Sequence, residues 1–240
     1  MIFSYAQYIE YLEYIKSFHT LRTFSNWQNQ PCILLRHDID FSVEMAYKLA
    51  QIEHKSESVS TYFFLVTGKT YNVLSHENQL KLRWINEHGF EIGLHFDPTL
   101  YPIDDLELLE KYARAEASIL ELIIGKKIHS LSLHNPSIHN QYPMFPSFIN
   151  AYDKKIFTED TYISDSCKSF RGKDPFRFVE NKEDKTLQIL LHPMHFQEED
   201  LSYSDILKKD IYNYVDDVHA MFLPNRSYKK EARTHLKNKL

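Results

Sequence analysis

The chain has 240 residues, of which 43% are hydrophobic and 25% are charged, a composition typical of a globular protein. Its formal charge of −5 and pI of about 6.2 give no support to a strongly basic nucleic-acid-binding surface. No run reaches the 18 apolar residues of a membrane span, and the N-terminus has no secretory signal pattern. We therefore expect a soluble cytoplasmic protein, with Cys32 and Cys167 as free, buried thiols.

Capping residues and apolar periodicity predict most helices and strands in chain order. Ser4, Ser42 and Ser75 can begin helices, and Gly89 and Gly125 can end them. Apolar residues at helical spacing predict helices at about 4–21, 42–55, 75–88, 104–124, 202–223 and 227–238. Apolar runs rich in β-branched and aromatic residues predict strands at 32–39, 59–66, 90–95, 128–134 and 186–192, with a short one at 161–165. The rest of 135–185 is interrupted by prolines and is expected to form long loops.

The alternation of strands and helices predicts a largely parallel sheet. The strands are apolar on both faces, as buried parallel strands are. The fold class is therefore α/β, and we expect a single domain over residues 1–240. Within it, residues 1–30 would form an N-terminal helical segment and residues 201–240 the C-terminal helices.

Four of the predicted strands end in titratable side chains, in the segments RHDID, GLHFD, SLHNP and LLHP. Ligands bind at the carboxyl ends of the strands in parallel α/β folds. Because strand side chains alternate, Asp38 and Asp40 should point to one side, and His37 and Ile39 to the other. Two carboxylates held that close repel each other unless one is protonated or a cation lies between them.

A divalent metal ion between the two carboxylates would neutralise this repulsion. Asp40 and nearby imidazoles would hold the ion, and Asp38 would act as a base on a metal-bound water, whose pKa zinc can lower to about 7. Each residue alone has a simpler interpretation, since a histidine at a strand end is often only hydrogen-bonded and Asp40 could cap the next helix. Four such strand ends in one fold favour the metal hypothesis.

With these motifs, the chain resembles the polysaccharide deacetylase superfamily, or carbohydrate esterase family 4, over roughly residues 30–200. It is most similar to a divergent branch that carries an R-H-D-[IV]-D motif and occurs in surface-polysaccharide biosynthesis. The resemblance implies a distorted, incomplete (β/α) barrel of about seven strands and metal-dependent removal of acyl groups from sugars. It also implies that Asp38 is the catalytic base, that Asp40 and His95 are metal ligands, and that His192 is the general acid.

One family position differs in this chain. The family has a second metal-binding histidine four residues after the first, where this chain has Thr99. We expect His134, which ends a neighbouring strand, to be the third ligand of the metal, with zinc as the expected ion and cobalt, nickel or manganese as alternatives. Asp97 is the next candidate ligand, and Thr99 could bind through a water.

Other residues could support such a site. Arg36, Asp97, Asp165 and Arg171 could touch substrate or orient the base, and an Arg beside a catalytic Asp would keep it ionised. Aromatic residues near the strand ends could stack on a sugar ring: Phe96, Tyr101, Tyr142 and Phe196.

The expected function is hydrolysis of an amide or ester on a sugar or polysaccharide precursor, with no nucleic-acid partner. Two alternatives stay open from the sequence. One is a catalytically silent, metal-poor relative that serves as a binding protein in glycan assembly. The other is an amidohydrolase that acts on a small non-sugar amide. The oligomeric state is not indicated.

Overall fold

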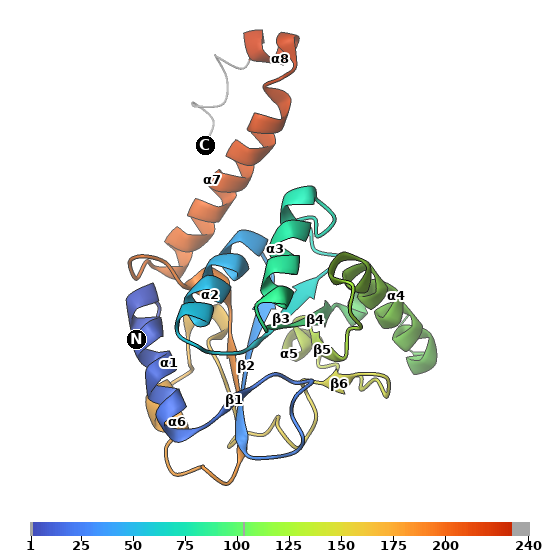
Figure 1. Cartoon of the computed structure of the whole chain (residues 1–240). Coiled ribbons are helices and arrows are strands. Elements are labelled where there is room, and N and C mark those ends of the chain that lie inside the picture. Colours follow the sequence, from blue (N-terminus) through green and yellow to red (C-terminus); the bar gives the residue numbers. More distant parts are fainter. Residues whose placement is uncertain (1, 103, 232–240) are drawn as a thin grey trace. The chain divides into compact units, whose positions relative to one another are not determined.

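The computed structural model describes residues 2–102 and 104–231, and the chain divides into two compact units, residues 1–200 and 201–240 (Figure 1). The described part of the second unit contains α7 (Tyr203–Phe222) and α8 (Arg226–Glu231). The helix predicted at 227–238 lies partly outside the described residues. No helix in the described part of the chain is both long and apolar enough to cross a membrane.

The first unit is built on one curled, parallel sheet that forms a half-barrel, so the predicted incomplete (β/α) barrel is confirmed. Seven strands lie side by side in the order β6-β5-β4-β3-β2-β8-β7, and β1 pairs with β2 beside this path. Every strand pairing in it is parallel. The strands are β1 (Leu21–Arg22), β2 (Cys32–Ile39), β3 (Thr61–Leu65), β4 (Glu91–Phe96), β5 (Ser130–Leu133), β6 (Ile149–Asn150), β7 (Tyr162–Ser164) and β8 (Thr186–Leu191).

The helices of this unit begin and end close to the predicted residues. Ser4 and Gln7 form the predicted capping box, Ser42 and Ser75 cap the next two helices, and Gly125 ends the fourth in a left-handed conformation. The helices are α1 (Tyr5–Phe18), α2 (Val43–Lys55), α3 (His76–Glu87), α4 (Leu106–Ile124), α5 (Pro136–His139) and α6 (Pro175–Phe178). Three 3₁₀-helices follow strand ends: η1 (Pro98–Leu100), η2 (Ser166–Lys168) and η3 (Pro193–His195).

Apolar side chains from the sheet and the helices pack into two clusters. The larger one joins β2–β5 with the inner faces of α2, α3 and α4, for example through Phe64, Leu82 and Leu120. The other joins α1 with β2 and β8, for example through Tyr8 and Leu187. All eight residues of β2 are buried, so this strand is covered on both faces. The core thereby fixes the carboxyl end of β2, where Asp38 lies.

A polar network lies within this core, on the face of β2 opposite to Asp38. Glu53 of α2 is fully buried and accepts hydrogen bonds from the hydroxyls of Tyr8, Ser60 and Tyr62 and from Nε2 of His37. His37 also lies 3.1 Å from the carbonyl oxygen of Leu191 through Nδ1. A carbonyl and a carboxylate only accept, so both ring nitrogens of His37 donate and the pair is a buried ion pair.

One sequence-based expectation is wrong. Cys32 is a free, buried thiol as predicted, but Cys167 is exposed. Cys167 lies in η2, in the segment between β7 and β8, rather than in a strand or on the inner face of a helix. Its position in a short surface turn leaves nothing to cover its side chain.

Candidate metal centre and catalytic site

The titratable side chains at the strand ends converge on one cavity at the carboxyl edge of the sheet. Asp38 lies in β2, and Asp40 follows it. His95 lies in β4, and His134 and His192 directly follow β5 and β8. All five line a cavity of about 190 Å³. The predicted alternation in β2 is also confirmed, since Asp38 and Asp40 face this cavity while His37 bonds to Glu53 on the other side.

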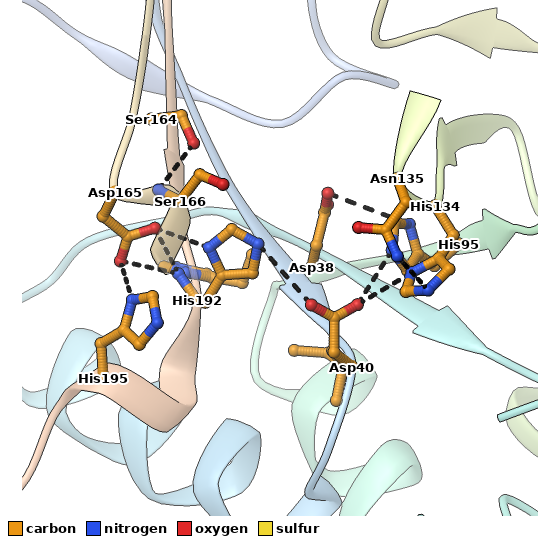
Figure 2. A network of polar contacts seen from close by, with 12 residues as sticks. Asp38, Asp40, His95, His134, Asn135, Ser164, Asp165, Ser166, His192 and His195 are labelled. Atoms are coloured by element: carbon orange, nitrogen blue, oxygen red, sulfur yellow. Dashed lines mark hydrogen bonds and ion pairs between the residues drawn. The ribbon is translucent and has the colours of Figure 1, made fainter. Parts of the chain in front are cut away.

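Asp40, His95 and His134 meet as a triangle of three possible metal ligands (Figure 2). Oδ1 of Asp40 lies 3.1 Å from Nε2 of His95 and 3.2 Å from Nδ1 of His134, and the two nitrogens are 3.1 Å apart. Ligand atoms of a tetrahedral zinc, at about 2.0–2.2 Å from the metal, lie about 3.3 Å apart or slightly more. The triangle therefore has nearly the size of one face of such a site.

Hydrogen bonds alone do not account for this triangle. If both nitrogens carried protons toward Asp40, the two N–H groups would face each other at 3.1 Å. If either nitrogen lacks a proton, its lone pair faces the carboxylate. A cation at the centre removes both conflicts, because a carboxylate oxygen and two imidazole nitrogens are common zinc ligands. The residues present therefore fit the metal that the sequence predicts.

Ser132 of β5 sets the tautomer of His95. Its hydroxyl lies 3.0 Å from Oδ2 of Asp38 and 3.1 Å from Nδ1 of His95. The carboxylate can only accept, so the single hydroxyl proton goes to Asp38 and Ser132 accepts from Nδ1–H of His95. In neutral His95 the lone pair is then on Nε2, which faces the triangle. Such a partner on the far nitrogen is the usual support of a metal-binding histidine.

The far nitrogen of His134 has a neighbour too. The amide nitrogen of Asn135 lies 2.8 Å from its Nε2. Amide oxygen and nitrogen positions are assigned from the hydrogen-bond network. A metal on Nδ1 of His134 requires the amide to turn so that its oxygen accepts from Nε2–H. Asn135 thus has the position of a supporting residue for His134.

The histidines stabilise the ionised form of Asp40. Burial acts to raise the pKa of Asp40, but hydrogen bonds that His134 and His95 donate to it in the absence of a metal outweigh this effect and hold the pKa well below its ordinary range. Asp40 is therefore a carboxylate at neutral pH and ready to bind a cation.

Asp38 is held by a different set of donors. Arg36, which is fully buried, donates from Nη2 to Oδ2 of Asp38 over 2.9 Å. The other contacts of this guanidinium go to Gln188 and to the hydroxyl of Tyr152, each at 2.9 Å. With Ser132 on its other side, the carboxylate of Asp38 is fixed in place. The predicted support of Asp38 by Arg36 is therefore present as a direct contact.

His192 lies between two aspartates (Figure 2). Its Nδ1 is 2.6 Å from Oδ1 of Asp165, and its Nε2 is 3.7 Å from Oδ2 of Asp40. Burial acts to lower the pKa of His192, but the charge and hydrogen bond of Asp165 outweigh it and raise the pKa to about 9. In the metal-free protein His192 is therefore protonated at neutral pH, with Nε2 toward the cavity.

Asp165 also contacts His195, and this second group of three could in principle bind a metal. However, Asp165 lies only 2.6 Å from Nδ1 of His192 and 2.8 Å from Nδ1 of His195. These separations suit charge-assisted hydrogen bonds and are well short of the spacing between two ligands of one zinc. Asp165 therefore acts as a shared acceptor for two histidines.

The remaining predicted residues lie differently. Asp97 caps η1 and accepts from the backbone and the hydroxyl of Thr99, so these two residues bond to each other. They are outside the triangle in which His134 takes the third place. Arg171 lines the cavity and is exposed, with a left-handed backbone at φ 52°.

Several cavity residues were missed from the sequence. Besides the predicted Tyr142, the lining includes Tyr152 and Phe157 from the irregular segment and Tyr162 from β7. Of the other aromatic candidates, Phe96 and Phe196 are core residues and Tyr101 stacks on Phe96. The clearest missed signal is Ser132, a buried hydroxyl between Leu131 and Leu133 in β5.

No protein-family model and no curated protein sequence matches the chain. Among solved structures it is similar to the chitin deacetylase from the fungal pathogen Colletotrichum lindemuthianum, with 13% identity over 78% of this chain and 84% of the other and a TM-score of 0.48. It is similar to the peptidoglycan deacetylase PdaC from Bacillus subtilis, with 18% identity over 87% and 98% of the two chains and a TM-score of 0.45.

A third similar structure is a CE4 family pseudoenzyme from Bacillus anthracis, with 12% identity and a TM-score of 0.44. The match covers 80% of this chain and 63% of that one, so the chain spans less than two thirds of the pseudoenzyme. All three matched proteins are named as deacetylases or as a CE4 family pseudoenzyme. Because every identity is low and every TM-score is below 0.5, they assign no activity to this chain.

Proposed function

We propose that the protein is a metal-dependent hydrolase that removes an acyl group from the nitrogen or oxygen of a sugar or polysaccharide precursor. One observation carries the proposal: the Asp40–His95–His134 triangle, Asp38 and His192 all line a single cavity. A base and an acid beside a metal site are the parts needed to hydrolyse an amide or ester. Because the motifs of the chain resemble those of a branch found in surface-polysaccharide biosynthesis, we propose a precursor of a surface polysaccharide as the substrate.

Zinc held by the triangle would supply a Lewis acid for the acyl carbonyl and for the attacking water. Asp38 would accept the proton of that water, while Arg36 and Ser132 keep its carboxylate in one orientation. His192 would donate its Nε2 proton to the leaving amine or alcohol. Asp165 holds the imidazole of His192 so that Nε2 faces the cavity. Exposed Arg171 and the aromatic residues Tyr142, Tyr152 and Phe157 would contact the sugar.

The first experiment tests the metal centre. Protein purified without added metal is titrated with Zn²⁺, Co²⁺, Ni²⁺ and Mn²⁺, and binding is followed by calorimetry and thermal shift. Loss of a residue that only supports a metal ligand typically weakens metal binding by about 10–100-fold. His134→Ala should weaken Zn²⁺ binding by more than this. His139→Ala is the matched control, since His139 is an exposed neighbour on α5. Equal affinities of the two variants would remove His134 from the site.

The second experiment tests the chemistry. The metal-loaded protein is screened for acetate release from N-acetylated sugars, O-acetylated sugars and small amides. Asp38→Asn should lower kcat by about 10²–10⁴-fold while the metal content stays at one ion per chain. Undiminished turnover with bound metal would exclude Asp38 as the base. A protein that takes up no metal and hydrolyses none of the substrates would instead support the silent, metal-poor binding protein.

A further inference from the structure

His195 contacts Asp165, the partner of His192, but does not itself line the cavity. His192 is among the described residues of the cavity lining, and His195 is not. His195 is 2% exposed, and its Nδ1 donates to Oδ2 of Asp165 over 2.8 Å (Figure 2). His192 uses the other oxygen, Oδ1, at 2.6 Å. The two imidazoles therefore share one fully buried carboxylate, one on each oxygen.

The contact with His195 decides which way the carboxylate of Asp165 faces. A carboxylate can turn about its Cβ–Cγ bond, and the backbone N–H of His192 is 3.1 Å from both oxygens, so it favours neither. In contrast, Nδ1–H of His195 donates to Oδ2 of Asp165 and not to Oδ1. Oδ1 is then left in line with Nδ1 of His192, whose Nε2 consequently faces Asp40.

The imidazole of His195 is itself held rigidly. Pro193 begins η3, and the backbone N–H of His195 donates to the carbonyl of His192 over 3.0 Å. The ring of Phe3 lies edge-on to the His195 ring, with centroids 6.0 Å apart and planes at 87°. The donor therefore has a fixed position relative to Asp165, as a support for a catalytic group requires.

We propose that His195 is a positioning residue: by donating Nδ1–H to Oδ2 of Asp165, it orients the carboxylate that in turn orients His192. The catalytic consequence rests on the proposed function of His192 as the general acid. The positioning itself does not, because it concerns only the orientation of Asp165 and of the His192 ring.

Substitutions of similar size separate the donor from the packing. His195→Asn keeps an N–H donor close to the place of Nδ1, and His195→Leu has nearly the shape of Asn without a donor. His195→Gln carries its N–H one bond farther from the backbone. The proton of a strong imidazole–carboxylate hydrogen bond gives a far-downfield NMR signal, and the signal of His192 is identified by its loss in His192→Gln.

The NMR arm needs no substrate. We expect the His192 signal to be retained in His195→Asn and to shift upfield or broaden in His195→Leu and His195→Gln. An unchanged signal in all three variants would overturn the proposal, and so would equal loss in all three, because the donor would then not matter. If His195→Leu does not fold, the comparison of Asn with Gln decides in the same way.

The kinetic arm uses the metal-loaded enzyme on whichever acylated sugar it hydrolyses. His195→Leu should lower kcat by about 10–100-fold with little change in KM or metal content, and His195→Asn should recover most of the loss. Wild-type kcat in His195→Leu would overturn the proposal. If the wild-type protein hydrolyses nothing, the proposed function fails, and the NMR comparison still decides whether His195 positions His192.

Discussion

The same substitution at two buried glutamates should have very different costs. Glu53 and Glu116 lie on helices, at 0% and 5% exposure. Glu53 receives four hydrogen bonds, one of them from the imidazolium of His37 at 2.7 Å, and the charge of His37 together with these bonds lowers the pKa of Glu53 against the effect of burial. Among the described residues, Glu116 receives one hydrogen bond, from Tyr101, and its Oε2 has no partner; burial raises the pKa of Glu116 to about 7.

Glu53→Gln removes the negative charge and replaces one acceptor oxygen with a donor. The imidazolium of His37 loses its counter-charge, and two of the four donors then meet an N–H₂ group. Breaking a buried ion pair from one side typically costs about 3–5 kcal/mol, and a folded domain is stable by only about 5–15 kcal/mol in total. At Glu116 the neutral acid is already partly populated at pH 7, so the neutral amide should cost about 1 kcal/mol or less.

Urea unfolding of the metal-free protein at pH 7 measures both costs. The difference in unfolding free energy between wild type and Glu53→Gln should also shrink at acid pH. The folded pKa of Glu53 is lowered, so its contribution is complete above its ordinary unfolded value of about 4.3 and is lost as pH falls toward the folded value. Equal costs at Glu53 and Glu116, or a Glu53 cost that does not depend on pH, would refute the charged network.

Three further outcomes are expected. In the metal-free protein the pKa of His192 is raised to about 9, so the contribution of its protonated form to stability is complete below about pH 6.5 and is lost as pH rises through about 9. The urea unfolding midpoints of wild type and His192→Gln should therefore converge at alkaline pH. Midpoints that stay equally far apart at every pH would contradict this. Gly93→Ala should lower the unfolding free energy by about 1–3 kcal/mol or more, because the new Cβ would lie 2.5 Å from Cε1 of Phe63. An unchanged thermal midpoint would show that the Phe63 ring moves away at no cost. Arg36→Lys should lower kcat at least about tenfold with metal content unchanged, because one ammonium cannot reproduce the planar fork that bonds Asp38 and two other groups; full activity would count against Arg36 as a support of the base.

Local rules were sufficient for much of the fold. Capping at Ser4, Ser42 and Ser75 and the strand at 32–39 follow from interactions within a few residues, which the sequence states directly. The two-residue strands β1 and β6 were not predicted, since so few residues carry no recognisable periodicity. Tyr142 was a candidate from the sequence, but Tyr152 and Phe157 were missed because most of 135–185 is irregular and its side chains are placed by tertiary packing.

The sequence alone determined which strand ends carry titratable groups, and that Asp38 and Asp40 share a face, because side chains alternate along a strand. Only the tertiary structure decided that His134, and neither Asp97 nor Thr99, completes the triangle with Asp40 and His95. The physical reason is the side-by-side order of the strands. Because β4 and β5 are hydrogen-bonded neighbours, their carboxyl ends meet, whereas the chain after His95 turns away into η1. The lateral order of strands depends on long-range pairing, which residue spacing does not encode.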